Sequence, residues 1–125
     1  VANKVPELTI AVGLNKTPSD KKQDPRIDLV SNPADGSLAQ WVVQKTKGTL
    51  ATAVVLPDGV AGFAEDERNH LVLVKVTPGQ PLRYLAGAAW SEAGEFTTKQ
   101  AWLDYVAGEA ARARSPVRVT VVPER

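Results

Sequence analysis

The chain has 125 residues, of which 43% are hydrophobic and 23% are charged, and this length is enough for one hydrophobic core but not for two ordinary domains. Fifteen Lys and Arg against fourteen Asp and Glu leave a net charge of +1, which excludes the strongly basic surface typical of nucleic-acid-binding proteins. No apolar run approaches the roughly 20 residues of a membrane-spanning helix, and the absence of cysteine together with a single histidine, His70, excludes thiolate and multi-histidine metal sites within this chain.

Patterns with a period of two predict strands in the first half of the chain. Large apolar residues alternate with small ones over 8–14, which indicates a half-buried first strand. The polar stretch 15–26 has no apolar side chain to anchor it, so we expect an exposed loop before a short edge strand at 27–30. The apolar segments 38–44 and 49–56 are separated by four residues that end in glycine, a spacing typical of a hairpin.

Two further strands are predicted on either side of a proline-rich turn. The polar block 65–69 leads into the β-branched run 70–76, which is typical of a central strand covered on both faces. Residues 77–81 form a turn, and another strand follows at 82–90. If these two strands pair as a hairpin through the turn, His70 lies near the Trp90 end of the second strand.

One segment near the end of the chain has the period of a helix. Thr97 and Gln100 fit a capping box at its start, and apolar residues recur at helical spacing from Trp102 onward. Pro116 stops the helix, and alternation over 117–121 predicts a last strand. The predicted fold class is therefore mainly β, with an antiparallel arrangement of about seven strands and one α-helix near the C-terminus.

The acidic block beside the only histidine is the first candidate for catalysis. Glu67 and His70 are the residues we select as general acid and base, because His70 lies where a loop enters a strand and its side chain can reach a cleft. The alternative is a solvated turn with a structural histidine. Calcium binding is a further alternative, although the block lacks the alternating Asp-rich loop with its glycine.

Aromatic residues are the second candidate, because the apolar face of a sugar ring packs on an aromatic face. Trp90 ends a predicted strand just before a polar turn, so we expect it to be partly exposed, and Tyr84 precedes it by six residues. Trp102 lies on the apolar stripe of the predicted helix and is assigned to the core. The alternative to a sugar contact is that Trp90, like Trp102, is a core residue.

The C-terminal third of the chain has a specific order of residues: tyrosine, glycine, tryptophan, glycine, phenylalanine, a helix with tryptophan, then serine-proline and a strand. The residues in this order are Tyr84, Gly87, Trp90, Gly94, Phe96, Trp102, Tyr105 and Ser115-Pro116. This pattern, with further similarity at 8–14 and 69–72, resembles the end of bacterial proteins of the domain-of-unknown-function family numbered 4861.

This resemblance implies an exported protein, secreted or periplasmic, that is longer than this chain and is often found beside pectin-degrading enzymes. It implies a large antiparallel β-sandwich of which residues 1–125 are the C-terminal part; otherwise, 1–125 form a single β-rich domain. The lack of methionine and the start at Val1 fit a processed or cut piece. The expected partners are therefore the N-terminal remainder of the same protein and an oligosaccharide or polysaccharide.

Two classes of function follow from the resemblance. The first is a polysaccharide lyase or glycoside hydrolase acting on pectin-type or other acidic polysaccharide, with Glu67 or His70 as acid or base and Trp90 with Tyr84 as sugar contacts. Arg83 is then expected to offset a uronate carboxylate. The second is a non-catalytic carbohydrate-binding or structural sandwich module. For either class we expect no metal, no cofactor, no nucleic acid and no membrane partner.

Overall fold

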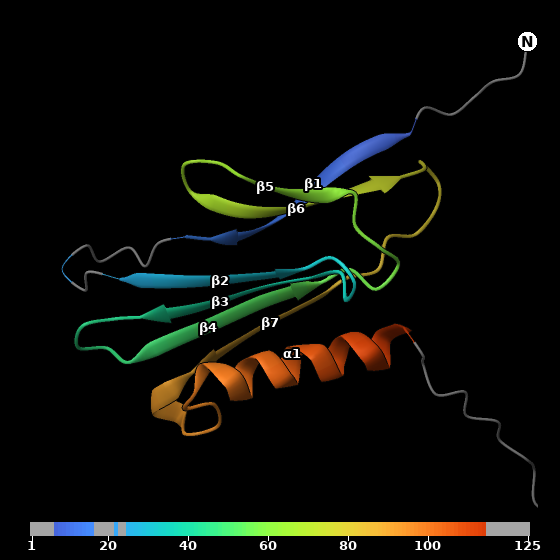
Figure 1. Cartoon of the computed structure of the whole chain (residues 1–125). Coiled ribbons are helices and arrows are strands. Elements are labelled where there is room, and N and C mark those ends of the chain that lie inside the picture. The colour runs from blue at the N-terminus through green and yellow to red at the C-terminus, as the bar shows by residue number, and fades with distance from the viewer. Residues whose placement is uncertain (1–6, 17–21, 23–24, 115–125) are drawn as a thin grey trace, which may run out of the picture.

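A computed structural model describes residues 7–16, 22 and 25–114, which form two stacked sheets with a helix on the outer face of the larger sheet (Figure 1). The strands are β1 (Leu8–Asn15), β2 (Arg26–Asn32), β3 (Ser37–Val43), β4 (Thr49–Val55), β5 (Gly62–Glu65), β6 (Asn69–Val76) and β7 (Leu85–Trp90). A 3-10 turn, η2 (Ser91–Ala93), and the helix α1 (Lys99–Arg114) follow β7. The predicted last strand at 117–121 lies outside the described residues.

Every neighbouring pair of strands is antiparallel. One sheet has the order β1-β6-β5 and the other has the order β2-β3-β4-β7. The predicted fold class, mainly β and antiparallel with one helix near the C-terminus, is confirmed. The predicted hairpin is also confirmed, because β3 and β4 pair from Val43 opposite Thr49 across the five intervening residues 44–48.

Two apolar cores separate the three layers, and β3 contributes to both. Its alternation sends Leu38 into the core between the sheets and Ala39 into the core beneath the helix. The core between the sheets contains Leu14, Leu38, Val54, Leu56, Val72 and Val74, and the core beneath the helix contains Ala39, Trp41, Ala51, Ala53, Val55, Trp102, Val106 and Ala110.

The predicted hairpin between the strands at 70–76 and 82–90 is wrong. β6 belongs to the three-stranded sheet, whereas β7 pairs with β4 in the other sheet, so the turn after β6 carries the chain from one layer to the other. β6 is central in its sheet as predicted, but Leu71 and Leu73 on its outer face are partly exposed. The strand covered on both faces is β3, because a sheet stacks on one side of it and α1 on the other.

The helix begins one residue later than the capping-box prediction. Thr98 Oγ1, and not Thr97, accepts a hydrogen bond from the Ala101 amide (3.2 Å), while the Gln100 side chain donates to Asp104 Oδ1 (2.8 Å). The predicted apolar stripe is confirmed, since the buried residues of α1 are Trp102, Val106 and Ala110. In the described part of the chain no helix is long and apolar enough to cross a membrane.

Gly36 ends the tight connection between β2 and β3. Its φ of +68° is a conformation that glycine adopts without steric cost, and a Cβ there would lie 2.2 Å from the carbonyl oxygen of Leu56. The close approach has a function in the fold, because the Leu56 amide donates to the Gly36 carbonyl (2.8 Å). This bond fixes the end of β4 against the β2–β3 turn.

Candidate functional site

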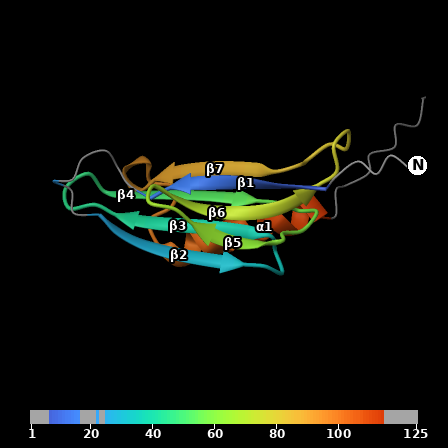
Figure 2. The ribbon, with the colours of Figure 1, turned by 90° about the horizontal axis from the view of Figure 1, so that it is seen from above.

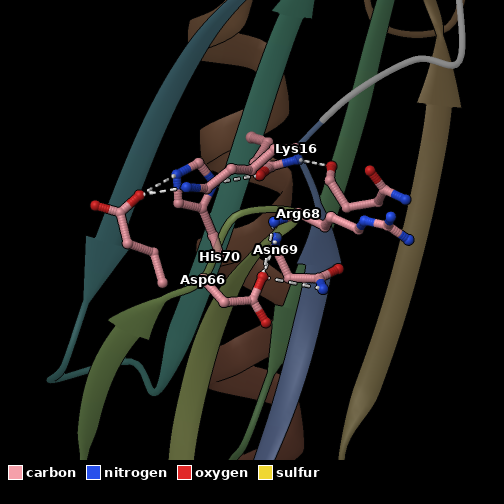
Figure 3. A network of polar contacts seen from close by, with 8 residues as sticks. Lys16, Asp66, Arg68, Asn69 and His70 are labelled. Carbon is pink, nitrogen blue, oxygen red and sulfur yellow. Dashed lines mark hydrogen bonds and ion pairs between the residues drawn. The ribbon is translucent and has the colours of Figure 1, made fainter.

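The acidic block forms the turn between β5 and β6, and Asp66 builds that turn. Its Oδ1 accepts hydrogen bonds from the amides of Arg68 (2.8 Å) and Asn69 (2.7 Å), and the first of these is the main cause of the lowered pKa of the Asp66 carboxyl. The Lys16 amide donates to the Arg68 carbonyl (2.8 Å), which joins the end of β1 to the turn (Figure 3). The Asp66 carboxylate therefore serves the backbone of the turn.

A histidine, a carboxylate and an ammonium group meet beside this turn. The registers place Glu65 and Leu14 opposite His70 on the two strands that flank β6. Glu65 Oε2 lies 2.5 Å from Lys16 Nζ and 3.7 Å from His70 Nε2. The His70 side chain is only 14% exposed, whereas that of Glu65 is 65% exposed, so the cluster opens to solvent on the carboxylate side.

Gln40 holds the other edge of the imidazole ring. Its Nε2 donates to the Asn15 carbonyl (2.9 Å) and to Thr52 Oγ1 (3.2 Å), and a carbonyl only accepts, so the amide oxygen of Gln40 faces His70. That oxygen lies 2.6 Å from His70 Nδ1, which must therefore carry the hydrogen. In the neutral ring Nε2 is then an acceptor beside Lys16 and Glu65.

The surroundings of His70 favour the neutral imidazole. Desolvation is the main cause of its lowered pKa; the Lys16 ammonium acts in the same direction, and the Glu65 carboxylate opposes both. The pKa of Glu65 is also lowered, first by its hydrogen bond from Lys16. Near neutral pH the cluster therefore contains a neutral base, an ammonium group and a carboxylate.

The structure places the other predicted catalytic residue, Glu67, at the exposed tip of the same turn. Within the described residues no hydrogen bond or ion pair joins Glu67 to His70, and the carboxylate that faces the ring is that of Glu65. A catalytic role for either Glu67 or His70 stays a prediction.

Trp90 is half exposed, with 49% of its surface accessible, as its position before a polar turn suggested. It pairs with Leu50 at the start of β4, and its indole Nε1 donates to the Lys47 carbonyl (2.8 Å). Alternation along β4 and β7 directs Trp90 toward the same side of the sheet as Thr52, the side on which the sheet of His70 stacks. The β3–β4 and β5–β6 turns lie at the same end of the two sheets (Figure 1), so Trp90 and His70 share that end.

An open cavity of about 600 Å³ adjoins Trp90. Its lining combines apolar and polar side chains, namely Gln44, Thr46, Lys47, Leu50, Trp90 and Glu92. The cavity therefore offers an aromatic face for stacking beside amide, hydroxyl and charged groups for hydrogen bonds.

Tyr84 and Arg83 lie at the opposite end of β7 from Trp90. The register pairs Leu85 with Val55, at the end of β4, so Tyr84 precedes the strand and does not share an unbroken strand with Trp90. Tyr84 is 54% exposed, and it lines a cavity with Arg83 and Arg112. Arg83 already donates to both carboxylate oxygens of Asp58 (2.7 and 3.2 Å), so a uronate carboxylate would have to compete with Asp58.

Sequence reasoning missed Lys16 and Gln40. Lys16 was assigned to an exposed loop, and only the pairing of β1 with β6 brings it to His70. Gln40 could have been found from the sequence, because it is a polar residue within an apolar segment that predicts a buried strand, and a buried polar side chain needs a hydrogen-bond partner. Among the described residues no group of three or more His, Asp and Glu side chains is placed to hold a metal ion.

Comparison with known proteins identifies relatives without a described activity. A family model described as "Domain of unknown function (DUF4861)" matches residues 1–119. The chain is similar to "Uncharacterized protein P7" of Formosa agariphila, with 26% identity over 104 residues, an alignment that covers 78% of this chain and 26% of that protein. The chain thus spans about a quarter of the length of the curated relative that it matches. No solved structure matches the chain.

Proposed function

This chain belongs to the DUF4861 family, and we propose that it forms part of a secreted bacterial protein that cleaves acidic, pectin-type polysaccharide by elimination. The observation that carries the proposal is the fixed tautomer of His70, which presents Nε2 as a base next to the Lys16 ammonium. Export belongs to the proposal because polymeric substrates of this kind lie outside the cell.

The chemistry of elimination matches these groups. In a uronate the proton at C5 is acidic because it lies next to the carboxylate, and a neutral imidazole can accept it. A cation beside the carboxylate stabilises the charge that develops as this proton leaves. The C4–O bond then breaks, its electron pair stays on the leaving oxygen, which takes a proton, and a C4–C5 double bond remains. His70 Nε2 is the proposed base and Glu67 the proposed proton donor. Lys16 is the proposed carboxylate partner, and a uronate would have to compete with Glu65 for it, since Lys16 Nζ lies 2.5 Å from Glu65 Oε2.

Elimination fits the cluster better than glycoside hydrolysis does. Most glycoside hydrolases place two carboxyl groups on either side of the scissile bond, one protonated and one ionised. Here the carboxylate nearest His70, that of Glu65, is engaged by Lys16 and its pKa is lowered, so it is held ionised and is a poor acid. A neutral imidazole beside an ammonium group supplies the base and the cation that elimination requires.

The second candidate is a non-catalytic carbohydrate-binding module. The half-exposed Trp90 favours it, because the bond from its indole nitrogen to Lys47 holds the ring beside the open cavity. Tyr84 and Arg83 would then extend sugar contacts to the far end of β7. This reading needs no base at His70.

Incubation with oligogalacturonides separates the two candidates, with the ultraviolet absorbance of the unsaturated product and tryptophan fluorescence as readouts. In the lyase, His70→Asn should abolish product formation while binding persists, because asparagine retains an amide donor toward Gln40 but provides no base. Lys16→Met should raise KM for the acidic substrate, whereas Lys75→Met, a change on the exposed outer face of β6, should leave it unaltered. Binding without product supports the module, and neither binding nor product contradicts both candidates.

A further inference from the structure

The two sheets have open edges on the same side of the molecule. Among the described strands, β1 pairs with β6 alone and β7 pairs with β4 alone, so each ends its sheet. β1 packs over β4, the neighbour of β7, and Figure 2 shows β1 and β7 along one long side with β2 along the other. One side of the stack therefore presents an edge strand in each layer.

Both of these edge strands are apolar and uncharged. β7 reads Leu-Ala-Gly-Ala-Ala-Trp, and β1 has no charged residue over Leu8–Asn15. Three large apolar residues on the facing sides of the two sheets remain exposed at these edges. They are Leu8 (48%), Ile10 (38%) and Trp90 (49%). An exposed apolar edge without charge, proline or bulge is what natural sheets avoid unless another strand pairs with it.

The opposite side of the stack is protected. β5 has only four residues and ends in Glu65. β2 carries Arg26 and Asp28, and Asp28 forms an ion pair with Lys99 of the helix (3.5 Å). Short edge strands and charged edge residues are the usual means of preventing strand addition. The contrast between the two sides indicates that the edges of β1 and β7 are built for pairing.

We propose that strands from polypeptide outside residues 1–125 add to the β1 and β7 edges and extend both sheets. The curated relative supplies the argument for this occupant, because the matched region is 26% of its length and the remaining polypeptide is long enough to supply further strands. Two edges on one side, one in each layer, let a single neighbouring β-unit continue both sheets at once. Main-chain hydrogen bonds to the edges then provide the affinity.

Hydrogen–deuterium exchange tests the proposal, with the 125-residue chain compared with the complete polypeptide encoded by its reading frame. The edge amides of β7 and β1 should exchange rapidly in the chain and more than an order of magnitude more slowly in the complete polypeptide. Amides of the β2 edge provide the internal control. Ala88→Lys on β7 should reduce the protection of the β7 edge, whereas Ser31→Lys, on the equivalent face of β2, should leave it unchanged.

Three results overturn the proposal. A reading frame that encodes no further polypeptide removes the occupant. Protection that is already present in the 125-residue chain and rises with its concentration identifies a second copy as the partner. If the edge amides of β1 and β7 are protected from exchange in the 125-residue chain at every concentration, the chain itself covers these edges.

Discussion

His70 Nδ1 and Gln40 Oε1 lie 2.6 Å apart and join the two sheets of the stack. Gln40 belongs to β3 and is 1% exposed, and His70 belongs to β6, so the bond crosses an interface that is otherwise mainly apolar. Thr52 continues the link, because its hydroxyl contacts Gln40 and its carbonyl accepts from Trp102 Nε1 of the helix (3.3 Å). No buried side-chain nitrogen or oxygen among the described residues lacks a partner, so the network is complete.

Replacing Gln40 should therefore be costly. Gln40→Leu keeps the volume but leaves His70 Nδ1 without its hydrogen-bond partner, and an unsatisfied buried group costs about 1–3 kcal/mol. Chemical denaturation should show a loss of this size. Gln80→Leu, in the exposed turn after β6, is the matched control and should change the free energy of unfolding little. Equal effects of the two substitutions would contradict the role given to Gln40.

The pKa of His70 should respond in opposite directions to its two charged neighbours. Lys16→Met removes a cation that lowers the pKa, so the pKa should rise; Glu65→Gln removes a carboxylate that raises it, so the pKa should fall. Titration of the imidazole proton signals by NMR measures both shifts without ambiguity, because the chain has one histidine. Shifts of the same sign would show that the cluster geometry is wrong.

The lowered pKa of His70 also predicts how stability depends on pH. In the unfolded chain His70 takes up a proton near the ordinary pKa of about 6.5, whereas in the folded chain it does so only at lower pH. The free energy of unfolding therefore decreases as pH falls from about 6.5 toward the pKa of His70 in the folded chain. His70→Asn should remove this part of the dependence. The lowered pKa values of Glu65 and Asp66 add a further loss at more acidic pH, which the variant retains. A wild-type profile that is flat just below pH 6.5 would contradict the burial assigned to the ring.

The helix cap gives a prediction that separates two adjacent threonines. Thr98→Ala should cost about 1 kcal/mol because it removes the acceptor for the Ala101 amide, whereas Thr97→Ala should cost little. Trp102→Ala should cost roughly 3–5 kcal/mol, since it empties a buried site between α1 and the sheet. Urea denaturation of the three variants measures these losses in the free energy of unfolding. A larger loss for Thr97→Ala than for Thr98→Ala would show that Thr97 is the cap, as the capping box predicts.

Local patterns were predicted from the sequence more successfully than pairings between distant strands. The β3–β4 hairpin and the buried stripe of α1 depend on residues close in sequence, so spacing alone identified them. The partner of β6 depends on which layer the chain enters after Pro78-Gly79, and turn chemistry is the same for a hairpin and for a crossing between sheets. His70 was selected as a candidate from its place in the sequence, but its contacts with Lys16 and Gln40 join residues 54 and 30 positions apart, which no local spacing encodes.

The most direct test of the proposed site is the His70 titration repeated with saturating oligogalacturonide. A uronate carboxylate held by Lys16 beside the ring should shift the imidazole signals and raise the pKa of His70, because the added negative charge favours the imidazolium. A neutral xylo-oligosaccharide at the same concentration should leave that pKa unchanged. An unaltered His70 titration with the acidic oligosaccharide would contradict the assignment of this cluster as the site of uronate recognition.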